Sequence, residues 1–425
     1  MRVCVLWPRL GPYHLARLRA SHARLGREGL EVVALETASQ DETYEWREER
    51  AAEPFRRVTA LPGRSFEATP PREIATAIAA ALDAEDPAAV AINSYSAPDS
   101  RAALAWCRRR RRPAVLMMES KADDAPRAAP REAVKGAIVR AFDAALAGGT
   151  PQREYLGALG FPPEAVFQPY DVVDNDFFAC GAEAARRAPE AWAHLPGVAS
   201  GDPDFGDGGP RPFFLASARF VTRKNLRRLL EAYAVYRTQA RGKPWRLVLL
   251  GDGPERERLE RIAASGAATP EAAGVTFAGF RQIDELPAYY GLAGAFVHVP
   301  LVEQWGLVVN EAMAAGLPVV VSRQTGCSRD LVRGNGRRVD GLSEAEIADA
   351  LAWVSAPETD RAAMGARSRE IVAGWSPEAF AEGLLAAVRA ARSRADRPMP
   401  LAARAALAAM HGLQRSVTSF YAIRE

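Results

Sequence analysis

One local pattern recurs along most of the 425-residue chain and limits its fold more than any other feature. Short apolar runs end in polar residues, and each run is followed by a segment with helical periodicity. The first cycle is an apolar run at Val3–Trp7, a helical segment at His14–Leu25 and a second apolar run at Leu30–Glu36. This strand–helix–strand order predicts a doubly wound parallel sheet, which binds ligands at the carboxyl ends of its strands.

The alternation continues through the first half of the chain. The further strands predicted there are Ala88–Asn93, Ala114–Glu119, Ala144–Ala147 and Ala165–Tyr170. The helices predicted between them are Pro71–Ala84, Ser100–Arg111, Pro130–Arg140 and Pro151–Leu159. The loop after the first strand, Gly11–His14, therefore falls at the ligand edge of this sheet. A histidine at a helix start is also a common surface residue, so His14 alone does not define a site.

The second half restarts the same pattern. Its predicted strands are Phe213–Ala218, Trp245–Leu250, Val275–Ala278, Ala293–Val299 and Val319–Ser322. Its predicted helices are Asn225–Gln239, Glu255–Ala264, Ile283–Gly291, Leu307–Ala315, Glu344–Ser355, Pro357–Val372, Pro377–Arg394 and Pro400–Leu413. Two α/β halves of similar size predict two Rossmann-like domains that face an inter-domain cleft, although no sequence repeat relates them.

Composition marks the domain boundaries. We predict a first domain over 1–178, a linker over 179–211, a second domain over 212–380 and C-terminal helices over 381–425 that pack toward the first domain. The linker contains a run rich in Gly, Pro and Asp. Asp202 and Asp204 lie in it, and because nothing there fixes a ligand geometry, we interpret them as linker residues and not as a metal site.

Charge and cysteine content exclude several function classes. The formal net charge of +3 is small for this length and gives no reason to expect a nucleic-acid partner. Four scattered cysteines without metal-like spacing favour a reduced, cytoplasmic protein with buried thiols. The basic run Arg108–Arg112 is more typical of a solvated helix end, while contact with an anionic membrane surface is the sharper alternative.

The stretch Pro300–Ser322 carries two carboxylates around a strand-to-helix turn. Glu303 precedes the predicted helix and Glu311 lies within it, with seven residues between them. A fully helical spacing would separate them by roughly 12 Å, which is the scale of the two sugars of a nucleotide sugar. The N–H groups around Gly306 at the helix start would suit a phosphate between the two carboxylates. Glu311 sits among apolar neighbours, which favours a partly buried position.

Two cations flank the loop after the first strand of the second half. Arg219 and Lys224 can converge on one ligand, since arginine offers a planar fork for phosphate oxygens and lysine a mobile point charge. A solvated basic loop that includes Arg223 is the alternative. Because this loop and the glutamate stretch are predicted at the same sheet edge, the anion-binding interpretation is the stronger one.

These residues lie in segments that resemble a known family. The run EQWGLVVNEAMAAGLPV, from Glu303 to Val319, resembles the double-glutamate motif of retaining glycosyltransferases with the GT-B fold, in particular family 4, the glycosyl transferases group 1. Upstream, SARFVTRKN, GDGP and VTFAGF occur in the order and spacing of that family. The resemblance runs from about Phe213 to Val339 and is weaker over the first half, where QPYDVVDNDFF looks like the segment before the linker.

The resemblance implies a role for each matching position. Arg219 and Lys224 would hold the donor diphosphate, Glu311 would accept hydrogen bonds from the ribose, and Glu303 would bind hydroxyls of the donor sugar. The backbone of Trp305, Gly306, Leu307 and Val308 would meet the sugar and the distal phosphate, and Phe280 and Arg281 would meet the base. In the first half, Gly11 and His14 would close over the sugar and the acceptor.

The resemblance also implies a mechanism and one departure from it. Such enzymes retain the anomeric configuration by front-face attack, and the leaving diphosphate takes the acceptor's proton. With Arg219 and Lys224 stabilising the diphosphate, we expect no metal ion and no cofactor beyond the nucleotide-sugar donor. Many relatives carry a histidine after a strand of the first domain where this chain has Glu119, Ser120 and Lys121. No catalytic histidine can therefore be assigned there, and the role of Glu119 is open.

The expected function is that of an EC 2.4 glycosyltransferase that moves a sugar from a nucleotide diphosphate to a hydroxyl acceptor. A polysaccharide, a lipid-linked molecule or a natural product are equally compatible acceptors, and peripheral association with the inner membrane face stays open. Two alternatives are a GT-B-fold nucleotide-sugar epimerase and a nucleotide-sugar-binding protein without turnover. The epimerase would need paired acid and base groups, for which only Glu303 and Glu119 are candidates, and the binding protein would be expected to lack Arg219 or Lys224.

Overall fold

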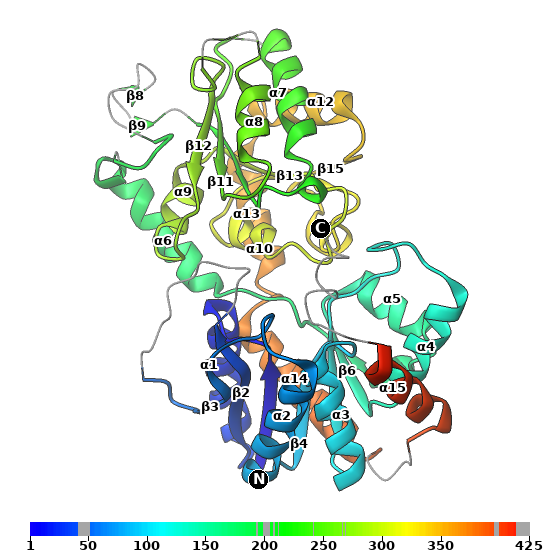
Figure 1. Cartoon of the computed structure of the whole chain (residues 1–425). Helices are drawn as coiled ribbons and strands as arrows, with labels where there is room; N and C mark the ends of the chain where they lie inside the picture. Colours follow the sequence, from blue (N-terminus) through cyan, green and yellow to red (C-terminus); the bar gives the residue numbers. More distant parts are fainter. Residues whose placement is uncertain are drawn as a thin grey trace. The chain divides into compact units, whose positions relative to one another are not determined.

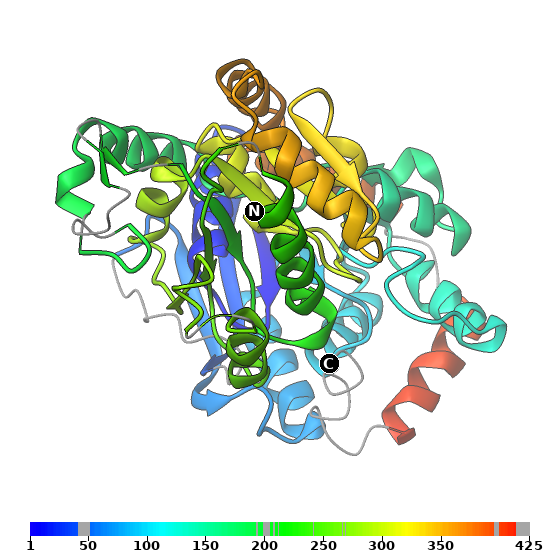
Figure 2. The same cartoon turned by 90° about the horizontal axis from the view of Figure 1, so that it is seen from above.

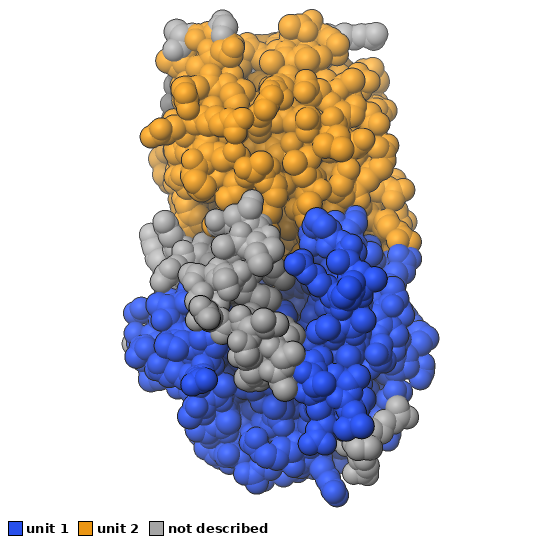
Figure 3. All heavy atoms as spheres, turned by 45° about the vertical axis from the view of Figure 1, so that its right-hand side comes forward, with its two compact units in different colours: residues 1–173, 376–425 blue, residues 174–375 orange. Residues whose placement is uncertain are grey.

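The computed structural model describes residues 1–40, 52–192, 194–198, 205–206, 209–210, 212–240, 242–265, 267, 269–394 and 399–413. Two compact units make up the chain, one of residues 1–173 with 376–425 and one of residues 174–375 (Figure 3). The division falls a few residues earlier than the predicted boundaries at 178 and 380. Asp202, Asp204 and the tail from Gln414 lie outside the described residues.

Unit 1 is built on a parallel sheet. Its described strands pair in the order β3-β2-β1-β4-β5-β6-β7. They are β1 (Arg2–Trp7), β2 (Glu31–Gln40), β3 (Arg56–Ser65), β4 (Ala89–Asn93), β5 (Ala114–Met118), β6 (Ala144–Ala147) and β7 (Val166–Phe167). β1 pairs with both β2 and β4, so the strand order reverses at β1 and the loop after it lies at a switch point.

Helices from both ends of the chain cover this sheet (Figure 1). They are α1 (Pro12–Gly26), α2 (Pro71–Glu85), α3 (Pro98–Arg110), α4 (Ala129–Val139), α5 (Thr150–Ala158), α14 (Pro377–Arg392) and α15 (Leu401–Leu413). α14 contacts α1 and β6, and α15 contacts α4. The C-terminal helices thus belong to the first unit although the second unit separates them from it in sequence.

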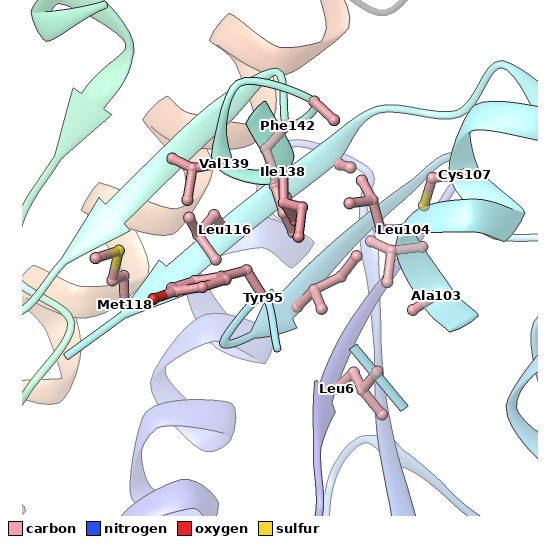
Figure 4. Packing of buried hydrophobic residues seen from close by; sticks show 14 of the residues in the cluster. Leu6, Tyr95, Ala103, Leu104, Cys107, Leu116, Met118, Ile138, Val139 and Phe142 are labelled. Atoms are coloured by element: carbon pink, nitrogen blue, oxygen red, sulfur yellow. The ribbon is translucent and has the colours of Figure 1, made fainter. Parts of the chain in front are cut away.

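Apolar side chains of strands and helices meet in a core on one side of the unit 1 sheet. Figure 4 shows Leu116 of β5 and Ile138 of α4 near the ring of Tyr95, with Leu104 of α3 beside them. All four are nearly inaccessible to solvent. Burial of this kind stabilises the unit by about 25 cal/mol for each Å² of apolar surface removed from water.

Unit 2 contains a second parallel sheet with the strand order β12-β11-β10-β13-β14-β15 in the described chain. The strands are β10 (Phe214–Ser217), β11 (Leu247–Leu250), β12 (Val275–Gly279), β13 (Ala295–His298), β14 (Val319–Ser322) and β15 (Gly336–Val339). Two short segments, β8 (Phe205–Gly206) and β9 (Gly209–Pro210), form a separate antiparallel pair. The order of the six-stranded sheet reverses between β10 and β13, which makes the loops after these two strands neighbours at the carboxyl edge.

The helices of unit 2 follow the alternation that the sequence predicts. They are α6 (Asn175–Arg187), α7 (Leu226–Gln239), α8 (Arg256–Ala263), α9 (Leu286–Leu292), α10 (Leu307–Ala314), α11 (Ser328–Leu331), α12 (Glu344–Ser355) and α13 (Arg361–Val372). α7 and α12 pack side by side (Figures 1 and 2). None of the described helices is long and apolar enough to cross a membrane.

Several elements were absent from the prediction or shorter than predicted. β3 was missed because its ten residues, RRVTALPGRS, are half-exposed at the sheet edge and lack an apolar run. α6 was not predicted: its residues 179–187 fall in the stretch predicted as linker and its start falls in the predicted first domain. Asp174 caps the helix by accepting a hydrogen bond from the Phe177 N–H. β15 (GRRV) and the single turn of α11 were not predicted, and the strand predicted at Ala165–Tyr170 is only two residues long.

The cysteine prediction holds for three of the four thiols. Cys4, Cys107 and Cys327 are buried and free, but Cys180 is exposed because it lies on the solvent side of α6. Burial raises the pKa of Cys4 to about 12, with nearby Glu85 adding to the shift, so this thiol stays protonated at neutral pH. It behaves as a small apolar core residue.

Candidate functional site

The loops after β10 and β13 meet at the switch point of unit 2. β10 and β13 are paired in parallel register, and the Leu301 N–H donates to the Arg223 carbonyl at 2.9 Å, which ties the two loops together. Lys224 and Glu303 form an ion pair across this junction, and each side chain retains about a sixth of its exposure. The two oppositely charged residues predicted for the diphosphate and the sugar are therefore in direct contact.

Glu303 is held in its charged form by two partners. Its Oε2 accepts from Lys224 Nζ and lies 3.2 Å from His298 Nε2. Burial alone would raise the pKa of this carboxyl, but the charge of Lys224 and the hydrogen bond from His298 hold the pKa of Glu303 well below its usual range. A carboxylate with fixed charge and fixed position is a good acceptor for vicinal hydroxyls.

A buried asparagine shapes the loop that carries Lys224. Residues Thr222–Lys224 form a single 3₁₀ turn, and Asn225 follows with φ of 59° in the left-handed region, which asparagine tolerates. The Asn225 side chain donates to the carbonyls of Val299 (2.9 Å) and Gly341 (2.7 Å). These bonds tie the end of the loop to the end of β13 and so set the position of Lys224 relative to Glu303.

The GDGP segment supports the same loop from its other side. A Cβ at Gly251 (φ 122°) would lie 1.9 Å from the Ala218 carbonyl oxygen, so only glycine fits this close approach. The Phe220 N–H donates to the Asp252 carbonyl at 2.7 Å, and the Glu255 N–H donates to the Phe220 carbonyl at 3.0 Å. Arg219 lies between these anchored residues, partly exposed at the strand end.

Gly306 starts α10 in a conformation that favours glycine. Its φ is 100°, and a Cβ there would lie 3.0 Å from Thr325 Cγ2. Leu307 and Val308 follow in the first turn, where backbone N–H groups have no partner within the helix. The Trp305 indole is buried and donates to Asn310 Oδ1 at 2.9 Å, which anchors the turn from inside. The backbone of this turn is thus placed to meet an anionic group.

Glu311 is buried, with 1% of its surface exposed, which agrees with the expectation from its apolar neighbours. The Tyr290 hydroxyl donates to Glu311 Oε2 at 2.7 Å. The Tyr290 ring packs edge-on against Phe178 of α6, with ring centroids 5.8 Å apart. A helix that the sequence did not predict therefore supports the glutamate predicted for the ribose.

The pair predicted for the base lies after β12. Phe280 and Arg281 are both half-buried. The Arg281 guanidinium is engaged within its own segment, since it pairs with Glu285 at 3.0 Å and donates to the Ala278 carbonyl. Its side chain braces the loop, which leaves the backbone as the part suited to a base contact, as the resemblance implies.

The candidate residues of unit 1 follow β1. The Gly11 N–H donates to His14 Nδ1 at 3.0 Å, and the imidazole packs on the Trp7 ring with centroids 4.8 Å apart. Burial, with a smaller contribution from Arg17, lowers the pKa of His14 to about 3. His14 is thus a neutral residue that packs on Trp7 and accepts a hydrogen bond at Nδ1, and not a solvated histidine at a helix start.

The polar residues after β5 form a second local group. Glu119 is half-buried, and Lys121 is 3% exposed and pairs with Asp123 at 2.5 Å.

The basic run Arg108–Arg112, at the end of α3, is partly neutralised. Arg108 pairs with Asp143 in a buried position, and Arg110 and Arg112 pair with Asp83 and Asp86. The interpretation of this run as solvated is therefore wrong for Arg108.

Three residues of the site went unnoticed in the sequence. They are Asn225, Tyr290 and His298. His298 carried a usable signal, because a histidine at the end of an otherwise apolar central strand needs a polar partner. Asn225 and Tyr290 carried no such signal, since asparagine before a helix and tyrosine within one are ordinary.

Comparison with known proteins now adds to this geometry. Residues 203–371 match the model of the glycosyl transferases group 1. Among curated proteins, the GDP-mannose-dependent alpha-(1-6)-phosphatidylinositol monomannoside mannosyltransferase of Mycobacterium tuberculosis is 34% identical over 186 residues, which cover 41% of this chain and 47% of that protein. The match thus spans about half the length of this curated relative.

Solved structures match over nearly the whole chain. The alpha,alpha-trehalose 6-phosphate synthase of Burkholderia multivorans aligns with a TM-score of 0.68 at 15% identity, over 91% of this chain and 96% of the other. The fold is GT-B. The Anabaena HepE protein, solved with UDP and glucose, aligns with a TM-score of 0.64 at 15% identity over 91% of this chain and 98% of its own. At such low identity these likenesses establish the shared fold and nothing more.

Proposed function

We propose that this protein is a retaining glycosyltransferase of family 4 that moves a sugar from a nucleotide diphosphate to a hydroxyl acceptor without a metal ion. One observation carries the proposal: Lys224 and Glu303 meet at the switch point of unit 2, in the segment that matches the glycosyl transferases group 1. A cation for phosphate and a carboxylate for hydroxyls are the two groups that a nucleotide sugar needs at its reacting end.

Different residues are assigned to the ribose, the sugar, the diphosphate and the base of the donor. Glu311, oriented by Tyr290, accepts from the ribose hydroxyls, and Glu303 accepts from hydroxyls of the sugar. Arg219 and Lys224 neutralise the diphosphate, helped by the N–H groups of the first turn of α10. Phe280 and Arg281 contribute backbone contacts to the base. In unit 1, the resemblance assigns Gly11 and His14 to the sugar and the acceptor.

The reaction follows from this division. The bond between the anomeric carbon and the diphosphate oxygen breaks while the acceptor oxygen attacks the same face of the sugar. The acceptor's proton passes to the departing diphosphate oxygen, so no protein base is required. The protein's contribution is to place Arg219 and Lys224 where negative charge develops, because such preorganised charges lower the barrier more than any ground-state contact.

The donor and acceptor are proposed from the relatives. GDP-mannose is the first donor to test, because it is part of the name of the mycobacterial mannosyltransferase, and UDP-glucose is the second, from the HepE complex. A glycolipid is the acceptor class we favour, since that mannosyltransferase is named for a phosphatidylinositol monomannoside. Such an acceptor would bring a cytoplasmic enzyme to the inner membrane face.

The test is a donor screen with the purified full chain. Release of free diphosphate and transfer to phosphatidylinositol monomannoside are measured with GDP-mannose and UDP-glucose, with and without EDTA. We expect hydrolysis of one donor, transfer with retained anomeric configuration by NMR, and equal rates with chelator. Interconversion of the donor sugar would indicate the epimerase instead, donor binding without turnover would indicate the binding protein, and complete loss with EDTA would refute metal independence.

A further inference from the structure

His298 stands out in the sheet of unit 2. It ends β13, whose other residues, Ala295, Phe296 and Val297, are fully buried and apolar. The imidazole itself is 4% exposed and stacks on the Phe296 ring, with centroids 6.3 Å apart and planes 15° from parallel. A buried polar ring at this position needs a polar partner, and Glu303 Oε2 lies 3.2 Å from its Nε2.

The N-cap residue of α10, Gly306, lies against both side chains. A Cβ at Gly306 would lie 3.4 Å from His298 Nε2 and 3.4 Å from Glu303 Cγ. The imidazole edge, the Glu303 stem and the helix start are therefore packed around a point with little space for a methyl group. His298 and Glu303 are held against the same turn that is proposed to meet the donor's distal phosphate.

Lys224 competes for the same carboxylate oxygen. Within the described residues, Lys224 and His298 are the side chains that the structure places in hydrogen-bond contact with Glu303, and both meet Oε2. A bound diphosphate would attract Lys224, because it carries more charge than one carboxylate. The hydrogen bond from His298 is then the contact that stays with Glu303 while the donor is bound.

We propose that His298 is a positioning residue for the donor sugar: it holds the Glu303 carboxylate toward the sugar hydroxyls when Lys224 turns to the diphosphate. This inference rests on the proposed function and assigns a role to a residue outside the double-glutamate motif. His298 touches neither the sugar nor the phosphate and acts through Glu303.

The protonation state of His298 suits this role. Burial lowers the pKa of His298, although the hydrogen bond and charge of Glu303 oppose the shift. A neutral imidazole with its proton on Nε2 donates one hydrogen bond to Glu303 and adds no charge that would compete with Lys224 for it. Glu303 keeps its full negative charge for the sugar hydroxyls.

Tyr290 and Glu311 provide a matched control at the other end of the donor. There too a buried side chain donates to a glutamate, at 2.7 Å, but the glutamate is the one proposed for the ribose. Removing the Tyr290 hydroxyl should therefore weaken the binding of a free nucleoside diphosphate and of the nucleotide sugar equally. Removing the His298 donor should weaken the binding of the nucleotide sugar alone.

The experiment compares the full chain with His298→Phe, His298→Gln and Tyr290→Phe. Calorimetry measures the affinity for GDP-mannose and GDP, and for UDP-glucose and UDP, and turnover is measured with the donor that binds. We expect His298→Phe to weaken the nucleotide sugar by about tenfold or more while the affinity for the free diphosphate stays unchanged. His298→Gln, which keeps an N–H donor, should recover most of the loss, and Tyr290→Phe should weaken both ligands alike.

The outcomes separate the two proposals. Failure of the wild-type chain to bind either donor would overturn the proposed function and this inference with it. If the wild type binds a donor but His298→Phe leaves its affinity unchanged, or weakens the free diphosphate just as much, the inference is wrong and the proposed function stands. Thermal midpoints show that each variant is folded, and retained diphosphate affinity shows it in addition for the two His298 variants.

Discussion

The carboxyl edges of the two sheets are built in different ways. At the edge of unit 2, the defining contacts join residues far apart in sequence: Lys224 and Glu303 are separated by 79 positions, and Tyr290 and Glu311 by 21. At the edge of unit 1, distant strand ends are also joined, since Trp7 Nε1 donates to the Tyr170 hydroxyl at 2.8 Å. The candidate residues of this edge, however, bind within their own loops. His14 accepts from Gly11, three positions away, and Lys121 pairs with Asp123, two positions away.

This difference concerns how each edge holds its geometry. Contacts between distant loops fix side chains relative to the whole sheet, so the residues proposed for the donor in unit 2 are held in place without a ligand. The local contacts of His14 and Lys121 fix these side chains relative to their own loops. The base of the β1 loop is tied to the unit 1 sheet, where the Leu10 N–H donates to Glu36 Oε2 at 3.2 Å and Arg57 and Thr59 hold Glu36.

The largest effect should come from the cations of the unit 2 edge. Arg219→Ala or Lys224→Ala should lower kcat by roughly a hundredfold to a thousandfold, because each removes charge from the site where the diphosphate leaves. The neighbouring Arg223→Ala is the matched control, since it removes a loop cation outside the proposed site. Steady-state kinetics with unchanged thermal midpoints checks this, and near-normal turnover in both variants would remove the site from unit 2.

A smaller loss is expected at the ribose end of the same edge. Glu311→Ala should weaken binding of the free nucleoside diphosphate by about tenfold to a hundredfold, because the buried charged acceptor proposed for the ribose is lost. Glu303→Gln should leave this affinity equal or stronger, since it releases Lys224 for the phosphates. Calorimetry distinguishes the two variants, and unchanged affinity in Glu311→Ala would contradict the ribose role.

Much of this fold was predictable because buried parallel strands are short apolar runs. β6 and β14 match their predicted bounds, as does α12, and the order of elements in both units follows from the alternation. β3 and β15 could not be found in this way, because edge strands are partly solvated and their sequences, RRVTALPGRS and GRRV, carry charges. Edge strands owe their structure to pairing with a neighbour, which a single sequence does not display.

The unit 2 site was more predictable than the unit 1 site for a related reason. Glu303 and Glu311 flank a helix start whose glycine and apolar residues are visible in the sequence. The loops that carry Lys224 and Glu303 were predicted at the same sheet edge, but the ion pair between the two side chains was not predicted. At the unit 1 edge, the packing of His14 on Trp7 depends on how one loop folds over its own strand. No periodicity encodes that fold, so a surface histidine was the equally reasonable prediction.

The role of the carboxyl edge of the unit 1 sheet can be tested at His14. His14→Phe should lower kcat/KM by about tenfold, through loss of one neutral donor, while the affinity for free diphosphate stays unchanged. Since the pKa of His14 is lowered to about 3, the imidazole stays neutral across the range from about pH 5 to 8, and wild type and variant should have parallel pH profiles there. A change of kcat/KM with pH near the ordinary histidine pKa, seen in the wild type but not in the variant, would show that His14 titrates and is exposed.

The smallest expected effect is a difference in how the free energy of unfolding depends on pH. The pKa of His14 falls from 6.5 to about 3 on folding, so the unfolded chain binds a proton first, and the stabilisation present above 6.5 is lost as pH falls toward 3. Between about pH 7.5 and 5.5 the free energy of unfolding of the wild type, measured with urea, should fall by about 1 kcal/mol more than that of His14→Phe.

Glu303 should contribute nothing in this window: its pKa is lowered from 4.5, so its stabilisation is complete above that value. His298, whose pKa is also lowered, adds the same slope to both proteins, so the difference between them belongs to the β1 loop of unit 1. Equal slopes in the two proteins would mean that His14 is solvated, and the contrast between the two edges would then rest on Lys121 alone.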